Sequence, residues 1–276
     1  KGGNVLMNVG PMGNGKFDSK DTDILRGIGE WMKVNGESIY GTTASPLTVQ
    51  SWGESTKKGN ALYLHVRDWP TDGHLLVGGL TAGIQKAYLL ADAKQKPLKT
   101  RVVNGKDLLL DVPTKAPGQV LSVIVLKTDG KLVIDPVRVL TLKDRPIALQ
   151  AFDAQLLGKE LVYGSGKNNQ QFVTHWRRPE QAIAWQFRLN EPARFQLTLS
   201  YNTDRDDEQG TVFVEVGGQK YPVKYTPSKT KSGPAMTLAV APVTLPAGVH
   251  EIKLMAGDFS GRQLLQPLNL TLEPLK

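Results

Sequence analysis

The sequence opens with KGGNVLMNVGPMGNGKFDSKDTDILRGIGEWMKVNGESIYGT, residues 1–42, which predicts a β-strand, a turn and an α-helix. Residues 5–9 form an apolar run that only Asn8 interrupts, and such runs are typical of strands covered on both faces, as in parallel sheets. Gly10 and Pro11 end the run, and residues 13–15 supply turn residues that tolerate a positive φ. The segment therefore predicts one strand–turn–helix unit of an α/β domain.

The predicted helix has clear start and stop signals. Asp18 or Ser19 is the expected N-cap, because a short oxygen-bearing side chain there accepts a hydrogen bond from a free backbone N–H. Asn35 followed by Gly36 predicts the end of the helix. The apolar residues between these signals recur at helical spacing and share one face, which consists of Ile24, Leu25, Ile28, Trp31 and Met32.

A strand–helix unit of this kind is not stable alone. A parallel strand needs parallel neighbours, and each neighbour arrives through its own crossover connection. Nothing after residue 42 repeats the pattern, so we expect this unit to be the last one of a larger α/β domain whose other units lie outside this sequence. The alternative is that residues 5–9 form an edge strand of the next domain, with the helix as a decoration.

Several motifs in the first half of the chain occur together in a known family. They are Asn8-Val9-Gly10-Pro11, WMKVNGESIYGT at 31–42, LYLHV at 62–66, DWP at 68–70 and KAYLL at 86–90. In this order they resemble the end of the catalytic domain and the following sandwich of family 29 glycoside hydrolases, the α-L-fucosidases. The resemblance covers about residues 1–145 and implies a bacterial, periplasmic or secreted retaining exoglycosidase that acts on fucosylated glycans.

Composition is that of an ordinary globular protein, with 40% hydrophobic and 22% charged residues. The net charge of +8 sits mainly in residues 43–146, where lysines are scattered and form no basic block, so we expect a solvated basic surface and no nucleic-acid binding. No apolar run approaches the length of a membrane span. The absence of cysteine excludes disulfides, thiol nucleophiles and Cys-ligated metals from this chain.

Two boundaries divide the chain, at residues 42–46 and 143–146. Short strands separated by Asp-Gly, Asn-Gly and Pro-Gly turns follow the first boundary, which predicts a β-sandwich over residues 43–146. Strand signals resume over residues 147–276, where the aromatic placement and the turn at 246–248 resemble galactose-binding-like carbohydrate-binding modules. The predicted fold class is mainly β, namely the last strand–helix unit of a (β/α) barrel over residues 1–42 followed by two antiparallel sandwiches.

We expect no catalytic residue in residues 1–276. Retaining glycosidases use two carboxylates about 5–5.5 Å apart, and the family resemblance implies that both precede residue 1. The acidic residues of the first segment fit capping and solvent-facing roles, and they are Asp18, Asp21, Asp23, Glu30 and Glu37. Because barrel active sites lie at the C-terminal ends of strands, Asn8, Gly10 and Pro11 are expected to back the sugar site without taking part in chemistry.

The last domain offers a candidate sugar site and a candidate metal site. Trp176 lies in a polar stretch beside His175 and Arg177, and an exposed indole there would stack on the apolar face of a sugar; core packing is the competing role of this tryptophan. A weak calcium candidate consists of Asp204, Asp206 and Glu208. A solvated turn is the favoured interpretation, because Arg205 opposes a cation and Gln209 stands where a calcium loop of the EF-hand type needs glycine. No other cofactor is expected.

These observations lead to two hypotheses. The first is that the chain is the C-terminal part of an α-L-fucosidase-like enzyme, where it completes and braces a catalytic barrel that precedes residue 1. The alternative is a non-catalytic accessory protein that binds glycans or serves as a structural spacer.

Overall fold

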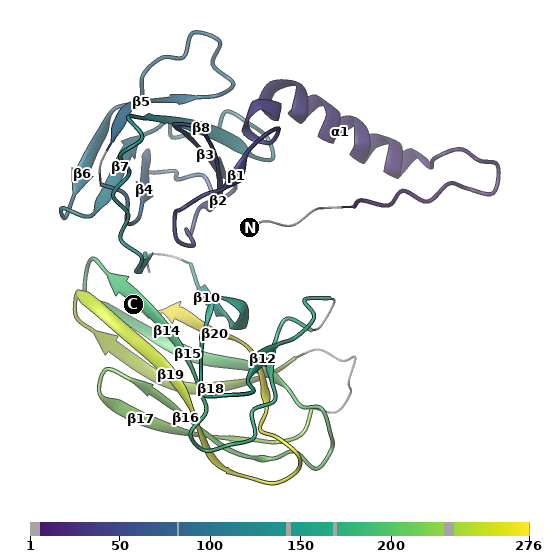
Figure 1. The fold of residues 1–276 in the computed structure, drawn as a ribbon, viewed down its shortest axis with the longest axis vertical. Helices are drawn as coiled ribbons and strands as arrows, with labels where there is room; N and C mark the ends of the chain where they lie inside the picture. Colours follow the sequence, from purple (N-terminus) through teal and green to yellow (C-terminus); the bar gives the residue numbers. More distant parts are fainter. Residues whose placement is uncertain (1–5, 82, 142–144, 168–169, 229–234, 276) are drawn as a thin grey trace. The chain divides into compact units, whose positions relative to one another are not determined.

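The computed structural model describes residues 6–81, 83–141, 145–167, 170–228 and 235–275. The chain is mainly β, with antiparallel sheets and the α-helix α1 (Ser19–Asn35), as Figure 1 shows, so the predicted mainly β class is confirmed. It divides into two compact units, residues 1–138 (unit 1) and residues 139–276 (unit 2). This division lies a few residues before the predicted boundary at 143–146.

Two antiparallel sheets pack face to face in unit 1. One has the order β1-β2-β3-β8-β5 and the other β4-β7-β6. The strands are β1 (Thr43–Ala44), β2 (Gly53–Lys58), β3 (Ala61–Val66), β4 (His74–Val77), β5 (Ile84–Leu89), β6 (Thr100–Val103), β7 (Asp107–Asp111) and β8 (Ser122–Thr128). Their facing sides share one apolar core, to which β3 contributes Leu62 and Leu64 and β7 contributes Leu108 and Leu110. The predicted hairpin at Asn104-Gly105 joins β6 to β7, and both residues have a positive φ.

The C-terminal end of α1 covers the second face of the larger sheet. Trp31 packs with Tyr63 and Tyr88, and its indole N–H donates to the Leu121 carbonyl at 3.0 Å. Just after the helix, Glu37 accepts a hydrogen bond from the Tyr63 hydroxyl at 2.5 Å. These contacts fix the end of the helix on the sheet, and in Figure 1 the rest of α1 extends away from the strands.

The helix bounds agree with the sequence signals. Asp18 is the N-cap, and its Oδ1 accepts from the Asp21 backbone N–H at 2.7 Å. The helix ends at Asn35, but Gly36 has a φ of −59°, which is right-handed. The chain therefore tightens into a 3₁₀ turn, η1 (Gly36–Ser38), instead of ending at a left-handed glycine.

The strand predicted for residues 5–9 does not form in this structure. Val5 lies outside the described residues, and residues 6–10 are irregular and mostly exposed. The described strands of unit 1 pair with one another and leave this segment without a partner. A parallel strand cannot satisfy its backbone N–H and C=O groups without neighbours, which explains the difference.

Two further strand predictions needed correction. The strand β2 is polar and lacks the apolar alternation that predicts a strand. Its side chains make hydrogen bonds instead: the Thr56 hydroxyl donates to the Ser38 carbonyl at 2.7 Å and lies 3.1 Å from the His65 Nε2. The apolar residues 132–134 would also suit one of the short strands of this sandwich, but here the structure has only an isolated bridge between Leu80 and Ile134. In β2, side-chain hydrogen bonds to residues distant in sequence thus accompany a strand that has no apolar alternation.

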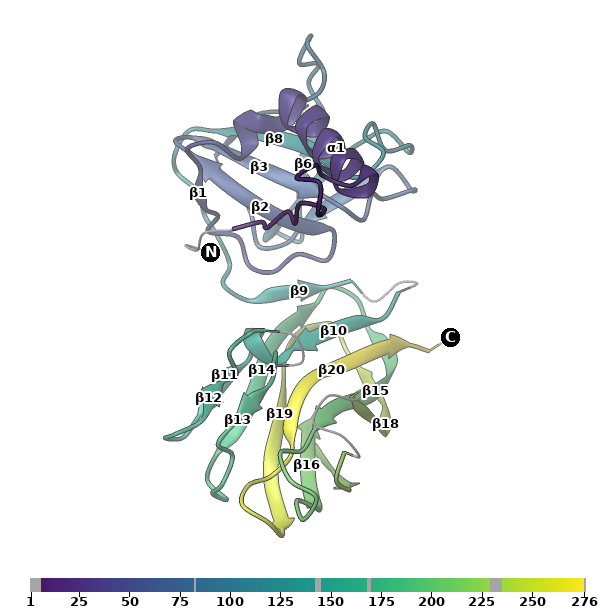
Figure 2. The same ribbon diagram turned by 90° about the vertical axis from the view of Figure 1, so that its right-hand side faces the viewer.

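Unit 2 is built on two larger sheets and one strand pair, which Figure 2 shows side-on. The first has the order β10-β20-β15-β18, the second β11-β14-β19-β16-β17 with β9 also beside β14, and the pair is β12-β13. The strands are β9 (Arg138–Leu140), β10 (Ile147–Gln150), β11 (Gln155–Leu157), β12 (Val162–Tyr163), β13 (Val173–Thr174), β14 (Ala182–Leu189), β15 (Ala193–Asn202), β16 (Gly210–Val216), β17 (Gln219–Tyr225), β18 (Met236–Leu245), β19 (Gly248–Phe259) and β20 (Gln266–Pro274), with the 3₁₀ turn η2 (Ala151–Asp153) after β10.

The core of unit 2 follows the alternation of its strands. β15 buries Phe195, Leu197 and Leu199, while the residues between them remain partly exposed. Two prolines, Pro222 of β17 and Pro242 of β18, lie on the outermost strands of their sheets, where a missing N–H is tolerated.

Truncation of a central core residue tests this packing. Leu64 lies on β3 with no exposed surface, so Leu64→Ala is expected to lower the free energy of unfolding by about 3 kcal/mol through lost burial and a residual cavity. Val102 on β6 is 48% exposed, and Val102→Ala is expected to change it by less than about 0.5 kcal/mol. Urea denaturation monitored by tryptophan fluorescence measures both. Equal effects of the two variants would contradict the assigned core.

Candidate functional site

Both candidate sites of the last domain, the sugar site and the metal site, lie at one end of unit 2. The loop end, as we name residues 174–181, 203–209 and 260–265, is joined by backbone and side-chain hydrogen bonds. The Gln263 side chain accepts from the His175 backbone N–H at 2.9 Å, and the Leu264 N–H donates to the Trp176 carbonyl at 2.8 Å. On the other side, the Ser260 N–H donates to the Gln209 carbonyl at 2.9 Å. Segments far apart in sequence thus form one continuous rim.

Trp176 is an anchor of this rim and not a platform. Its side chain has no exposed surface, and its indole N–H donates to the Gln181 carbonyl at 3.1 Å. The expectation that Trp176 is exposed was therefore wrong, and neither ring face can stack on a sugar in this structure. The indole packs into the core of unit 2, and of its two neighbours His175 is exposed and Arg177 is half-buried.

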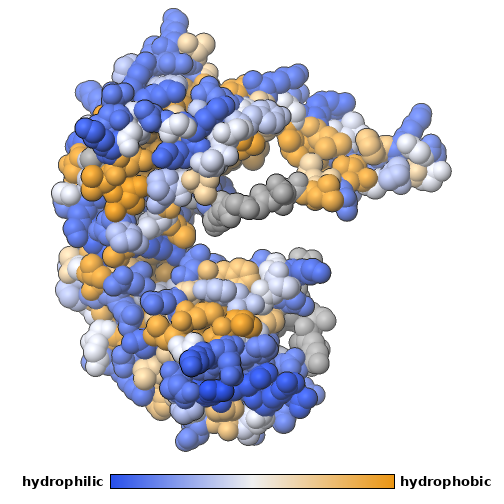
Figure 3. Space-filling view, in the orientation of Figure 1, coloured by the Kyte–Doolittle hydropathy of each residue, from blue (hydrophilic) through white to orange (hydrophobic). Residues whose placement is uncertain are grey.

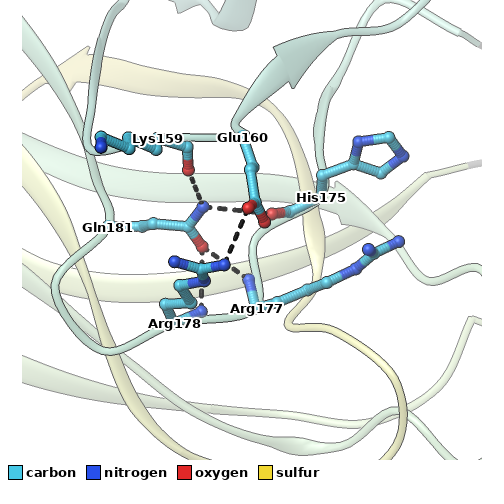
Figure 4. A network of polar contacts seen from close by, with 6 residues as sticks. All are labelled: Lys159, Glu160, His175, Arg177, Arg178 and Gln181. Atoms are coloured by element: carbon cyan, nitrogen blue, oxygen red, sulfur yellow. Dashed lines mark hydrogen bonds and ion pairs between the residues drawn. The ribbon is translucent and has the colours of Figure 1, made fainter.

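A buried glutamine holds the backbone around Trp176, as Figure 4 shows. Gln181 is 1% exposed, and its Oε1 accepts from the backbone N–H groups of Arg177 at 2.7 Å and Arg178 at 2.9 Å. Its Nε2 donates to the carbonyls of Lys159 at 2.5 Å and His175 at 3.3 Å. A single side chain therefore satisfies four backbone groups and fixes the loop conformation.

His175 and Arg177 project from this fixed loop. His175 has a φ of +64°, a left-handed conformation that is uncommon outside glycine, and its side chain is exposed. In Figure 4 its ring and the Arg177 guanidinium lie on the same side of the loop. Arg178 lies on the other side, where its Nη2 is 2.7 Å from the Glu160 Oε1. Two of the three predicted sugar-binding side chains are thus presented together on a rigid loop.

The acidic segment 204–208 forms a turn closed by its own glutamate. Glu208 has no exposed surface, and its Oε2 accepts from the backbone N–H groups of Asp204 at 2.7 Å and Arg205 at 3.3 Å. Among the described residues, no group of three or more His, Asp or Glu side chains is arranged to hold a metal ion. The three residues of the weak calcium candidate, Asp204, Asp206 and Glu208, do not converge on a common point, because Glu208 turns inward and binds backbone.

Burial leaves part of this glutamate without a partner. The Glu208 Oε1 and the Tyr225 hydroxyl are both buried and make no hydrogen bond among the described residues. Burial raises the pKa of the Glu208 carboxyl above its ordinary value; the two backbone donors act in the opposite direction, and Asp204 and Asp207 reinforce the rise. Burial also raises the pKa of the Tyr225 hydroxyl, with Glu208 as the next cause.

The N-terminal candidates lie in a different environment. Asn8, Gly10 and Pro11 are exposed, and a Cβ added at Gly10 would meet no atom within 4 Å. No described strand pairs with this segment, and the role of these residues behind a sugar site stays a prediction. Within the part of the chain that the structure describes, no helix has the length and apolar character that crossing a membrane requires.

Sequence reasoning did not identify Gln181 and Gln263. Each stands in a polar segment and has the composition of a surface residue. The only signal was position, since Gln181 directly precedes the apolar run of β14 and Gln263 precedes a buried Leu-Leu pair. Their importance follows from burial, which only the folded structure defines.

The first part of the chain is similar to known α-L-fucosidases. Residues 1–37 match the family model of α-L-fucosidases. An α-L-fucosidase of Branchiostoma floridae is 34% identical over 122 residues, which are 43% of this chain and 27% of that protein. The human plasma α-L-fucosidase is 39% identical over 119 residues, 41% of this chain and 25% of the enzyme. The matched region thus spans about a quarter of the length of these relatives.

A solved structure shares the fold of nearly the whole chain. The α-L-fucosidase from Vibrio sp. strain EJY3 superposes with a TM-score of 0.60 over 97% of this chain and 47% of that one, at 22% sequence identity. The resemblance to α-L-fucosidases predicted from the motifs is therefore confirmed, and the likeness of fold extends into unit 2.

The buried carboxyl of Glu208 predicts a pH-dependent stability. Because its pKa is raised on folding, the folded state binds this proton more tightly than the unfolded state, and stability falls as pH rises from about 4 through the folded pKa. Glu208→Gln keeps an acceptor for the Asp204 N–H and removes the buried charge. We expect the variant to be more stable at pH 7.5 by about 1 kcal/mol and to lose less stability between pH 5 and pH 7.5.

Urea denaturation at both pH values measures this difference. The exposed Glu191 provides the control, since Glu191→Gln also removes one carboxylate and should leave the wild-type pH dependence in place. A Glu208→Gln variant with the wild-type dependence would show that this carboxyl is not the source.

Proposed function

Because the chain is related to the α-L-fucosidases over about two fifths of its length, we propose that it is the C-terminal part of a retaining exo-α-L-fucosidase that removes terminal α-L-fucose from glycans. In this proposal residues 1–42 complete a catalytic barrel that precedes them, and the sheets that follow brace it. The single observation that carries the proposal is the exposed apolar surface of the segment that matches the family model.

That surface is large for an isolated chain. Along the N-terminal segment and α1, several large apolar side chains are 42–90% exposed, namely Leu6, Met7, Met12, Phe17, Ile24 and Ile28. Figure 3 shows apolar colour along this projecting part of unit 1. Burying one such side chain fully is worth about 1.5–3 kcal/mol. The proposed cover is the rest of the barrel, whose parallel strands would also pair with residues 5–9.

Three acidic residues of this segment have structural partners, which supports the proposed placement of the catalytic carboxylates elsewhere in the enzyme. Asp18 caps the helix, Asp23 pairs with Arg26 at 3.0 Å, and Glu37 accepts from Tyr63. A retaining glycosidase needs a carboxylate nucleophile and a carboxylic acid/base on either side of the scissile bond. We therefore place both in the preceding part of the enzyme, with a fucosylated glycan as substrate and a periplasmic or secreted location in a bacterium.

The proposal predicts no turnover by this chain alone. Purified residues 1–276 should release no phenol from an aryl α-L-fucoside above the buffer rate, because the two carboxylates are missing. A longer polypeptide that includes the preceding barrel should be active. Efficient hydrolysis by residues 1–276 would refute the assignment.

A helix-face variant separates this proposal from a free-standing role. Ile24→Glu/Ile28→Glu changes residues that are exposed here, so in residues 1–276 it should alter the free energy of unfolding by less than about 1 kcal/mol. In the longer enzyme the same change would bury two charges, and activity and stability should both collapse. The matched control is Arg26→Glu/Lys33→Glu, because both residues are exposed and lie on the face of α1 opposite Ile24 and Ile28.

We propose glycan binding by unit 2 as a second function, and the observation that favours it is the fixed loop with His175 and Arg177. A rigid loop loses little conformational entropy when it binds, and both side chains donate hydrogen bonds to sugar hydroxyls or substituents. In the accessory-protein alternative this function would stand alone.

Loop substitutions test the second function. His175→Asn is matched to the backbone, because asparagine tolerates a left-handed φ, and Arg177→Gln removes the charge while keeping a donor. In calorimetric titration with fucosylated and galactosylated oligosaccharides, the double variant should weaken binding by about tenfold. Unchanged binding would exclude this loop, and absence of binding by wild-type chain would leave unit 2 a spacer.

A further inference from the structure

We propose that Phe152 and Tyr163 form an aromatic platform on unit 2, which stacks on a neutral pyranose ring and extends the His175 loop into a longer glycan site. The inference deepens the glycan-binding function proposed for unit 2 and rests on it. The two residues belong to separate elements, since Phe152 lies in the 3₁₀ turn η2 and Tyr163 ends β12. The fold brings their rings into contact and leaves both exposed to solvent.

Exposure distinguishes these two rings from the other large aromatic side chains of unit 2. Phe152 is 41% exposed and Tyr163 is 45% exposed. Most other Phe, Tyr and Trp side chains of the unit are buried, namely Trp176, Trp185, Phe187, Phe195, Tyr201 and Tyr225. Apolar side chains that are exposed singly are normal on protein surfaces, whereas two adjacent rings form a contiguous apolar surface of the kind that marks binding sites.

The aromatic platform is held rigidly. Its ring centroids are 5.5 Å apart and the ring planes lie at 75°, which is an edge-to-face contact. The Tyr163 hydroxyl donates to the Ala154 carbonyl at 2.7 Å, so this ring is fixed to the residue that follows η2. The backbone of Gly166 lies against the other ring, because a Cβ there would be 3.3 Å from the Phe152 Cε2. A surface fixed in this way loses little conformational entropy on binding.

The size of the aromatic platform suits a sugar ring and not a protein partner. Two aromatic side chains of about 150–250 Å² each, exposed to 41% and 45%, present roughly 130–215 Å². A stable protein interface buries about 800 Å² on each partner. A pyranose ring needs an apolar surface of only its own size, because it presents C–H groups on one face and hydroxyls along its edge.

Asp153 gives the aromatic platform a polar edge. It follows Phe152 in η2 and is exposed. Burial raises the pKa of the Tyr163 hydroxyl, and the charge of the nearby Asp153 carboxylate adds to this rise. A carboxylate has about four acceptor sites, so it can accept hydrogen bonds from sugar hydroxyls. Its negative charge repels an acidic sugar, and the aromatic platform therefore favours a neutral one.

A single β-ribbon connects the aromatic platform to the His175 loop. Tyr163 of β12 pairs with Val173 of β13, and β13 ends at Thr174, directly before His175. At about 3.3 Å per residue, His175 follows the residue opposite Tyr163 by about 7 Å. One oligosaccharide can therefore stack on the aromatic pair and accept hydrogen bonds from His175 and Arg177.

Titration of residues 1–276 with fucosylated and galactosylated oligosaccharides tests the aromatic platform, with calorimetry and ligand-observed NMR as readouts. At least one of these sugars should bind, with saturation transfer strongest to the C–H protons of one ring face. Phe152→Leu/Tyr163→Leu keeps the apolar bulk but removes both aromatic faces, so it should weaken binding at least about tenfold. Phe152→Tyr keeps the aromatic face and should bind like the wild-type chain.

Val249 provides a control for the loss of exposed apolar surface. It is 50% exposed and pairs with Arg188 near one end of β14, whereas β11, the strand that follows η2, pairs with the other end. Val249→Ala should bind like the wild-type chain. D-Sorbitol, a polyol without a ring, should not compete with the bound sugar. Urea denaturation of each variant separates loss of binding from loss of folding.

Three results would overturn the aromatic platform. They are binding that Phe152→Leu/Tyr163→Leu leaves unchanged, an equal loss in Val249→Ala, and a preference for D-glucuronate over the neutral sugars. If His175→Asn/Arg177→Gln abolishes binding while the aromatic variant does not, the sugar binds at the loop, so the glycan-binding function stands and the aromatic platform fails. If the wild-type chain binds no sugar, both fail. The fucosidase assignment is independent of every one of these results.

Discussion

Exposing apolar side chains to water costs free energy, so such side chains are normally covered by another part of the protein. In unit 1 this constraint applies to helix α1. The two ends of the helix differ in this respect. Near its C-terminal end Trp31 packs on the sheet and Glu37 binds Tyr63, whereas Ile24 and Ile28 face solvent. Unit 1 thus covers part of the apolar face of α1 and leaves the rest exposed.

The same constraint acts on the backbone that precedes the helix. Residues 6–10 have the composition of a buried strand, yet the structure pairs them with none of the described strands. A strand requires a neighbour for its hydrogen bonds just as an apolar face requires a cover. The catalytic barrel that we propose would meet both needs, because its parallel sheet would supply a neighbouring strand and an apolar cover. The relationship to α-L-fucosidases is consistent with this physical argument but is independent of it.

In unit 2 the organising interactions are buried amides and a buried carboxylate. Gln181 fixes the backbone from Lys159 to Arg178, Gln263 connects it to the loop that follows β19, and Glu208 closes the adjacent turn. Loops with this many satisfied backbone groups lose little entropy on binding, which suits a recognition surface. The Glu208 Oε1 is buried without a hydrogen-bond partner among the described residues, so closing this turn costs the free energy of removing the carboxylate from water.

Local signals in the sequence determined the helix from Ser19 to Asn35, most strands of both units and the hairpin at Asn104-Gly105, because caps, alternation and turn residues act over a few positions. Tertiary structure alone decided what those signals left open. It buried Trp176 instead of exposing it, turned Glu208 away from a metal role, made a strand of the polar residues 53–58 and left residues 6–10 unpaired. Burial and strand pairing depend on groups that are distant in sequence, so the residue itself and its near neighbours do not determine them.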